Sequence, residues 1–266
     1  MPKIDVGNGT KIYVDIVGTG KPILFIHGWL FPGGIFDYQK ASVAQKGFCG
    51  LSMDLRGFGQ SDRPGEYDYD TWCEDIGEVI KELGLADVTL VGYSMGGAIT
   101  AHYCATRKDP RISRLILLSA AAPSAARAAE DKTRYDGYIQ SIVSGQAQAV
   151  SDFSKNLFNT PISAEYEQWL ISVGQDASLQ ACVRGLEELR DRDLGTELEQ
   201  ITVPTLICHG KHDKIMPVWM AKEQKQLIKD SVLVRFRESG HGLFLDEKNN
   251  LAEWLVKFSG FNPQTG

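Results

Sequence analysis

The sequence predicts an α/β fold, in which helices flank a mostly parallel sheet. Short continuous apolar runs recur along the chain, as expected for strands buried on both faces, and helical patterns lie between most of them. The alternation breaks once, in a long stretch without a predicted strand, and this break predicts a helical insertion. The length of 266 residues is within reach of one such domain.

The N-terminal segment is predicted to form an antiparallel hairpin. Lys3–Val6 and Lys11–Val17 are extended runs on either side of Gly7-Asn8-Gly9, and an Asn-Gly step between such runs is a strong hairpin signal. The runs that follow predict the strands of the parallel sheet: Pro22–His27, Phe48–Asp54, Val88–Tyr93, Ile112–Ala120, Thr205–His209 and Val232–Phe236.

Helical periodicity is clear between the second and third of these runs. The segment Thr71–Gly84 is predicted to be a helix with its apolar residues on one face and Gly84 at its C-terminal end. The apolar residues at helical spacing are Trp72, Ile76, Val79, Ile80 and Leu83. Strands that alternate with such helices form βαβ units, which give a parallel sheet.

The break lies between Ala122 and Gln200, where apolar stripes occur at helical spacing and no strand is predicted. Because sheet strands precede and follow it, this stretch must leave the sheet and return. We therefore predict a core of residues 1–121 and 201–266, and a cap of about four helices at 122–200, inserted before the penultimate strand.

Composition excludes several classes of partner. The 28 Lys and Arg against 34 Asp and Glu give a net charge of −6, which disfavours nucleic acid. No apolar run approaches the 18 or more residues of a membrane span, and the first ten residues lack the pattern of an export signal. Five scattered cysteines are typical of reduced thiols. We expect a cytoplasmic location without membrane partners; the sequence does not indicate the oligomeric state.

One motif predicts a nucleophile. Gly92-Tyr93-Ser94-Met95-Gly96 matches G-x-S-x-G, directly follows a predicted strand and directly precedes the predicted helix Gly97–Arg107. This strand–turn–helix setting is what a nucleophile elbow requires, because the turn lifts the serine hydroxyl above the sheet. The sequence therefore predicts that Ser94 is a catalytic nucleophile.

A serine hydroxyl needs a base to take its proton and an acid to orient that base. Of five histidines, only His241 follows the last predicted strand, and flanking glycines allow its loop to fold back over the sheet edge. Asp213 lies just beyond the strand Thr205–His209, whereas the segment after the preceding strand holds no carboxylate. We therefore predict Ser94, Asp213 and His241 as a catalytic triad.

The order Ser, Asp, His along the chain is that of the α/β-hydrolase fold, and the chain resembles this family over nearly its whole length. It is most similar to the cofactor-free haloperoxidase/arylesterase branch of serine carboxylesterases, which also contains lactonases and perhydrolases. The segments that carry the resemblance are His27-Gly28-Trp29, Asp54–Asp62, Gly92–Gly97, His209-Gly210 with Asp213 and Pro217, and His241-Gly242-Leu243.

The resemblance implies a serine esterase that forms an acyl-enzyme on small to medium carboxylic esters. It implies an oxyanion hole formed by the backbone N–H groups of Trp29 and Met95, a small-molecule ester or lactone substrate, and no cofactor. We expect the acyl pocket to be lined by Trp29, Tyr138, Trp169 and Leu243, beneath the predicted cap.

Other interpretations stay open or are set aside. In the haloperoxidase branch a proline usually follows the oxyanion residue, but Leu30 stands there, which disfavours efficient peracid chemistry. A lactonase or a perhydrolase/acyltransferase with the same triad is the nearest alternative, and a small-molecule receptor with a slow triad is the alternative from another class. The pair His209 and His212 lacks a third distant ligand group, so no metal site is predicted.

Overall fold

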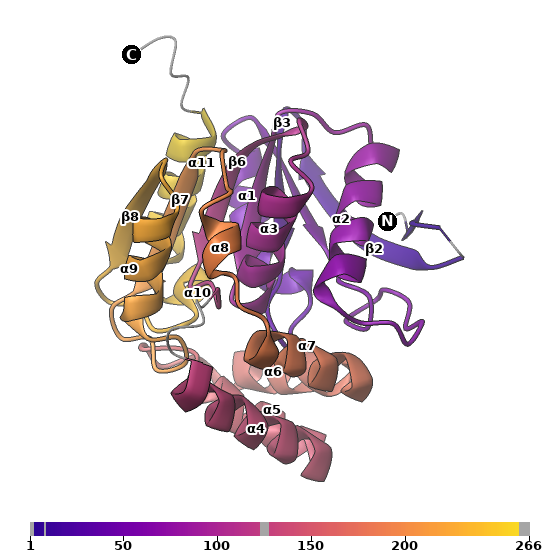
Figure 1. Ribbon diagram of the computed structural model, residues 1–266, viewed down its shortest axis with the longest axis vertical. Helices are drawn as coiled ribbons and strands as arrows, with labels where there is room; N and C mark the ends of the chain where they lie inside the picture. Colours follow the sequence, from indigo (N-terminus) through magenta and orange to yellow (C-terminus); the bar gives the residue numbers. More distant parts are fainter. Residues whose placement is uncertain (1–2, 8, 123–127, 261–266) are drawn as a thin grey trace.

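A computed structural model describes residues 3–7, 9–122 and 128–260. Its centre is an eight-stranded sheet with the order β1-β2-β4-β3-β5-β6-β7-β8 (Figure 1). The strands are β1 Lys3–Asp5, β2 Lys11–Gly18, β3 Lys21–Ile26, β4 Phe48–Met53, β5 Val88–Tyr93, β6 Ile112–Leu118, β7 Thr205–Gly210 and β8 Ser231–Phe236. All the strands predicted from apolar runs are present.

Strand directions confirm the predicted fold class. β1 pairs with β2 and β2 with β4 in antiparallel register, so the N-terminal hairpin is confirmed, although Asn8 of its turn lies outside the described residues. Every other pair in the sheet is parallel. The central strands are buried on both faces, which explains why they appear in the sequence as unbroken apolar runs.

Helices cover both faces of this sheet. On one face α1 contacts β4 and α11, and on the other α2, α3, α8 and α9 form a continuous row of contacts. The bounds are η1 Gly33–Phe36, α1 Asp37–Ala44, α2 Tyr69–Glu82, α3 Met95–Thr106, α8 Gly195–Leu198, α9 Val218–Leu227, α10 Leu243–Asp246 and α11 Lys248–Gly260.

The helix α2 illustrates how local sequence determines these elements. The side chain of Asp68 accepts a hydrogen bond from the N–H of Thr71 at 2.7 Å and caps the first turn. Trp72, Ile76, Val79 and Ile80 of the predicted apolar face are buried, and α2 packs on α3. Leu83 follows the end of the helix and is only partly buried. Just beyond the helix, Gly84 adopts a φ of 62°, a left-handed conformation that is typical of a helix C-terminus.

Four longer helices lie between β6 and β7: α4 Ala128–Ser144, α5 Gln146–Ser154, α6 Ala164–Gln175 and α7 Leu179–Asp191. They gather at one end of the sheet and pack mainly on one another (Figure 1). The helical insertion before the penultimate strand is therefore present. The division into a core of 1–121 and 201–266 and a cap of 122–200 stays a prediction, and residues 123–127 at its first boundary lie outside the described residues.

The state of the cysteines and the length and polarity of the helices relate to the predicted cytoplasmic location. All five cysteines are free thiols, and four of them are buried. In the described ranges, no helix is long and apolar enough to span a membrane.

Candidate active site

Ser94 occupies the turn between β5 and α3 in a strained conformation. Its φ is 51° and its ψ is −118°, in the region that L-residues other than glycine seldom adopt. The backbone N–H of Ser94 donates to the carbonyl of Leu118 at 3.0 Å, and its own carbonyl accepts from Gly97 and Ala121. These bonds hold the strained turn between β5 and β6, as a nucleophile elbow requires.

The two glycines of the motif are required by close approach. A Cβ on Gly92 would lie 2.1 Å from the hydroxyl oxygen of Thr100, and a Cβ on Gly96 would lie 2.2 Å from the carbonyl oxygen of His27. A side chain on Gly92 would push α3 away from β5, and a side chain on Gly96 would push α3 away from the end of β3. The spacing of G-x-S-x-G is thus explained by contacts of the turn with its neighbours.

Asp213 and His241 come together at the carboxyl end of the sheet, in the loops after β7 and β8. The Nδ1–H of His241 donates to Oδ2 of Asp213 at 2.8 Å, and both side chains are only 1% exposed. The buried Nε2 of His241 has no hydrogen-bond partner among the described residues. The ring of Tyr93, the residue before Ser94, lies 5.0 Å from the imidazole of His241 between centroids. The imidazole and Ser94 therefore share one edge of the sheet.

The surroundings of Asp213 favour its ionised form. Burial alone raises the pKa of this carboxyl, but the charge and hydrogen bond of His241, the nearby His209 and the N–H of Met216 outweigh burial and hold the pKa below its usual value. Burial lowers the pKa of the neighbouring His209, whose Nε2–H donates to the carbonyl of Met216 at 2.9 Å. A neutral His209 leaves Asp213 available to His241.

The backbone N–H groups of Trp29 and Met95 donate to no acceptor among the described residues. Trp29 follows β3 and Met95 opens α3, so both lie at the same edge of the sheet as Ser94. The contact of Gly28 with Ser94, where a Cβ on Gly28 would lie 3.0 Å from the serine Cβ, brings the first of these loops against the elbow. Unpaired N–H groups at such a position can stabilise a developing oxyanion.

Two other histidines near the site have structural partners. The Nδ1–H of His27 donates to the carbonyl of Gly28 at 2.8 Å, and its Nε2 accepts from the N–H of Leu55 at 2.9 Å. Burial lowers the pKa of His27, which fits this neutral form. His27 therefore positions the loop that leads to Trp29 and has no free nitrogen for proton transfer.

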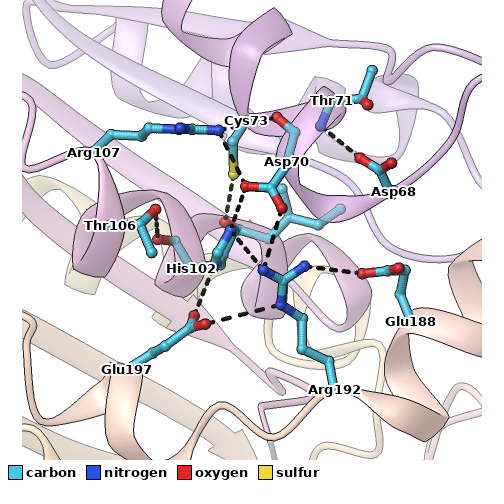
Figure 2. Close-up of polar contacts among 11 residues, drawn as sticks. Asp68, Asp70, Thr71, Cys73, His102, Thr106, Arg107, Glu188, Arg192 and Glu197 are labelled. Carbon is cyan, nitrogen blue, oxygen red and sulfur yellow. Dashed lines mark hydrogen bonds and ion pairs between the residues drawn. The ribbon is translucent and has the colours of Figure 1, made fainter.

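His102 belongs to a separate polar cluster, shown in Figure 2. Its Nδ1 lies 2.6 Å from Oε2 of Glu197, and its Nε2 lies 3.2 Å from both Oδ1 of Asp70 and a guanidinium nitrogen of Arg192. These partners come from α8, α2 and the segment after α7. The His102 cluster thus ties the chain that returns from the helical insertion to two helices of the sheet layer.

The sequence did not indicate the role of Asp246, at the end of α10. Its Oδ2 accepts from the N–H of Gly240 at 2.8 Å, in the His241 loop, and from the N–H of Asn159 at 2.9 Å. Its Oδ1 accepts from the N–H of Thr160 at 2.9 Å. Asp246 therefore joins the loop of His241 to the loop between α5 and α6.

The residues predicted to line the acyl pocket do not all line one cavity. Trp29 and Tyr138 line one cavity of about 150 Å³, where the two ring centroids are 5.9 Å apart and Phe153 packs on both rings. Trp169 instead lines two other cavities, next to Gly34. Leu243 is completely buried in α10. Their role in substrate binding stays a prediction.

The described residues contain no group of three or more side chains suited to bind a metal ion. A strained serine at a strand-to-helix turn, together with a buried Asp–His pair at the same sheet edge, characterises hydrolases of the α/β type. A family model described as alpha/beta hydrolase fold matches residues 21–248. The chain belongs to this family, as its resemblance in sequence indicated.

Three known proteins place the chain within the family. It is 41% identical over 254 residues to the AB hydrolase superfamily protein YisY of Bacillus subtilis, covering 93% of this chain and 95% of that protein. It is 31% identical to a non-heme haloperoxidase of Rhodococcus erythropolis, with 97% and 99% covered. An esterase from Exiguobacterium antarcticum superposes with a TM-score of 0.93 at 37% identity, covering 97% of this chain and 99% of that one. The relatives include both esterases and haloperoxidases, so the similarity to this branch is confirmed.

Proposed function

We propose that the protein is a serine esterase that hydrolyses small to medium carboxylic esters. The observation that carries this proposal is the Asp213–His241 pair, which directs the unpartnered Nε2 of the imidazole to the sheet edge that holds Ser94. The similarity to the Exiguobacterium antarcticum esterase supports the same activity.

The proposed reaction begins with proton transfer. Nε2 of His241 takes the hydroxyl proton of Ser94 while the serine Oγ bonds to the ester carbonyl carbon. The carbonyl oxygen becomes an oxyanion and accepts hydrogen bonds from the N–H groups of Trp29 and Met95; loss of one such donor typically costs about 3–4 kcal/mol of transition-state stabilisation. Asp213 remains ionised and stabilises the imidazolium.

The tetrahedral intermediate then collapses. The bond to the leaving alcohol breaks, the alcohol oxygen takes the proton from His241, and the acyl group remains on Ser94. Water attacks the acyl-enzyme with His241 again as the base, which releases the carboxylic acid and restores the serine hydroxyl. The cycle balances without a cofactor.

We assign the acyl group of the substrate to the cavity beside Trp29, whose backbone N–H belongs to the proposed oxyanion hole. Its volume of about 150 Å³ is below the roughly 300–1,000 Å³ typical of sites for drug-sized ligands. In this proposal the helices of residues 122–200 form a roof over Ser94 that excludes water and so strengthens the oxyanion contacts. A cytoplasmic location remains part of the proposal.

Leu30 supports hydrolysis over peracid formation within this branch. The residue is completely buried and has a φ of 73°, whereas the ring of a proline fixes φ near −65°. The proline that usually follows the oxyanion residue in haloperoxidases therefore cannot adopt this loop conformation. The loop of Trp29 must differ from theirs at this point.

The proposal is tested with a fluorophosphonate probe and a panel of p-nitrophenyl esters, lactones and an ester with hydrogen peroxide as the acyl acceptor. We expect rapid covalent labelling of Ser94 and turnover that is highest on short-chain esters. Ser94→Ala should lose both labelling and turnover while the fold remains, because only one small hydroxyl is removed.

Each alternative gives a different result in the same assay. A folded protein that neither labels nor turns over any substrate would favour the receptor alternative, and the esterase proposal would be wrong. Faster turnover of lactones or faster peracid formation than ester hydrolysis would assign the same residues to those reactions instead.

A further inference from the structure

A second cavity, of about 540 Å³, lies between α6 and the sheet layer. Its floor includes the buried residues Lys40, Ser52 and Asp54 together with Asp15, and Trp169 and Val173 of α6 form one wall. None of the residues that line it belongs to the candidate triad or to the cavity beside Trp29. Its volume falls within the range of small-molecule binding sites.

The polar groups of the floor are fixed by the sheet. Asp15 of β2 and Ser52 of β4 are directly opposite each other in an antiparallel pair, so their side chains lie side by side on one face. The ammonium group of Lys40, whose side chain is 1% exposed, forms ion pairs with Oδ2 of Asp15 and, at 2.9 Å, with Oδ1 of Asp37.

The side chains of Lys40, Asp15 and Ser52 each have hydrogen-bonding capacity that the described residues leave unused. The ammonium of Lys40 has three N–H donors and two carboxylate partners. Oδ1 of Asp15 is buried without a hydrogen-bond partner. Ser52 is 2% exposed, and no described residue forms a hydrogen bond with its hydroxyl. Buried polar groups are normally paired, so unused capacity at the floor of a cavity points to a ligand.

The lining carries four carboxylates, those of Asp15, Asp37, Asp54 and Asp176, and one ammonium, that of Lys40, so an anion is disfavoured. Asp15 and Asp37 already pair with Lys40, and both oxygens of Asp54 accept hydrogen bonds from backbone N–H groups. A neutral hydroxyl group can donate to a carboxylate and accept from an ammonium or a serine hydroxyl. The indole of Trp169 supplies an apolar wall against which a ring can pack.

We infer that this cavity binds a neutral polyhydroxylated ring, such as a sugar or a cyclitol. The hydroxyl groups contact the floor formed by Lys40, Asp15 and Ser52, and one face of the ring packs on Trp169. The site is separate from the candidate active site and does not depend on the proposed esterase activity.

The test uses methyl β-D-glucopyranoside and myo-inositol as probes, with saturation-transfer difference NMR and calorimetry on the full chain. We expect saturable binding of at least one probe with a dissociation constant on the order of 1–10 mM. Cyclohexanol is the control for a ring with a single hydroxyl. Binding should persist in Ser94→Ala, because the cavity does not include the candidate nucleophile.

A pair of variants on α6 locates the site. Ser172 is an exposed residue at the rim of the cavity, and Ser172→Trp should fill the opening and weaken binding at least tenfold. Gln168→Trp adds the same side chain at an exposed position outside the lining and should bind as the wild type does. Melting temperatures check that both variants fold.

Three results would overturn the inference. The first is no saturable binding of either polyol, and the second is cyclohexanol binding as tightly as the polyols. The third is unchanged polyol binding in Ser172→Trp.

Discussion

The two carboxylate oxygens of Asp213 accept hydrogen bonds from different donors, one from His241 and the other from the loop that contains Asp213. Oδ2 accepts from the imidazole Nδ1–H at 2.8 Å, while Oδ1 accepts from the N–H groups of Ile215 and Met216 at 2.9 and 2.7 Å. The backbone bonds prevent rotation of the carboxylate, so Oδ2 stays directed at the histidine. The orientation of the imidazole is therefore determined by the loop after β7.

This arrangement predicts the effect of Asp213→Asn. The amide oxygen of asparagine can still accept from Ile215 and Met216, so the amide NH₂ takes the place of Oδ2 and faces Nδ1 of His241. The imidazole would then carry its proton on Nε2 and could not act as the base. We expect kcat on p-nitrophenyl acetate to fall by about 10³–10⁴ with little change in melting temperature.

The matched control is Asp230→Asn, the same chemical change at an exposed carboxylate outside the site. It should leave kcat unchanged. If Asp213→Asn kept more than about a tenth of the wild-type rate, a loss far below that typical of triad acids, Asp213 would not be the orienting acid.

Asp246 is expected to position His241 indirectly. Asp246→Asn replaces one carboxylate oxygen by an NH₂ group that faces the backbone donors of Gly240 and Asn159 or of Thr160. Unpairing these donors should lower the free energy of unfolding by about 1–3 kcal/mol. It should also lower kcat, because the His241 loop loses one of its anchors.

The measurements for Asp246→Asn are urea unfolding and kcat, with Glu253→Gln on the exposed surface of α11 as the control. A loss of stability with an unchanged kcat would mean that Asp246 braces the fold but does not position the histidine.

The strands and the elbow could be predicted from the sequence because their signals are local. Strands buried on both faces appear as apolar runs in the sequence. The close approaches at Gly92 and Gly96 require a glycine at each of these two positions, which are four residues apart. The positions of Asp213 and His241 followed from the rule that parallel strands place their carboxyl ends at one edge.

The contacts of Asp246 and the separation of Trp169 from Tyr138 could not be predicted. Asp246 binds residues that are 86 and 87 positions away, and no local pattern marks such a bond. Helical periodicity identified Tyr138 and Trp169 as apolar-face residues, but it does not show which neighbour each face contacts. The packing of α4 and α6 determines which neighbours Tyr138 and Trp169 contact.

The His102 cluster predicts a purely structural effect. His102→Ala removes the partner of Glu197 within a partly buried network, which should lower the free energy of unfolding by about 1–3 kcal/mol. Because the cluster is separate from Ser94, kcat on the smallest ester should change little. His212→Ala, at an exposed loop histidine, is the control and should leave stability unchanged. Loss of activity without loss of stability would contradict a structural role.

The ionised carboxylate of Asp109 is expected to make the free energy of unfolding decrease in acid. Burial alone raises the pKa of this carboxyl, but hydrogen bonds from Arg111 and Tyr103 outweigh it and lower the pKa to about 2. In the unfolded chain an aspartate has a pKa of about 3.9, so the folded state binds this proton less readily. The ionised carboxylate therefore stabilises the fold above about pH 3.9, and this contribution is lost as the pH falls through about 2.

Urea unfolding of the wild type and Asp109→Asn between neutral pH and pH 2 measures this effect. The difference in unfolding free energy should be constant near neutral pH and should shrink as the pH falls below about 3.9. A difference that stayed the same over the whole range would show that ionisation of Asp109 does not stabilise the fold.

Tyr138 and Trp169 provide a paired test of the acyl pocket. Tyr138 shares the cavity of about 150 Å³ with Trp29, whose backbone N–H belongs to the proposed oxyanion hole. Tyr138→Ala should enlarge this cavity and shift the preference of the enzyme toward longer acyl chains, with a smaller effect on the shortest ester. Trp169→Ala removes a ring of similar kind from α6, where it lines different cavities. Its chain-length profile should match that of the wild type.

Both changes remove a partly buried ring and should lower the melting temperature, so stability alone does not distinguish them. The ratio of kcat/KM for butyrate and octanoate esters does, and equal profiles for both variants would contradict a substrate-lining role of Tyr138.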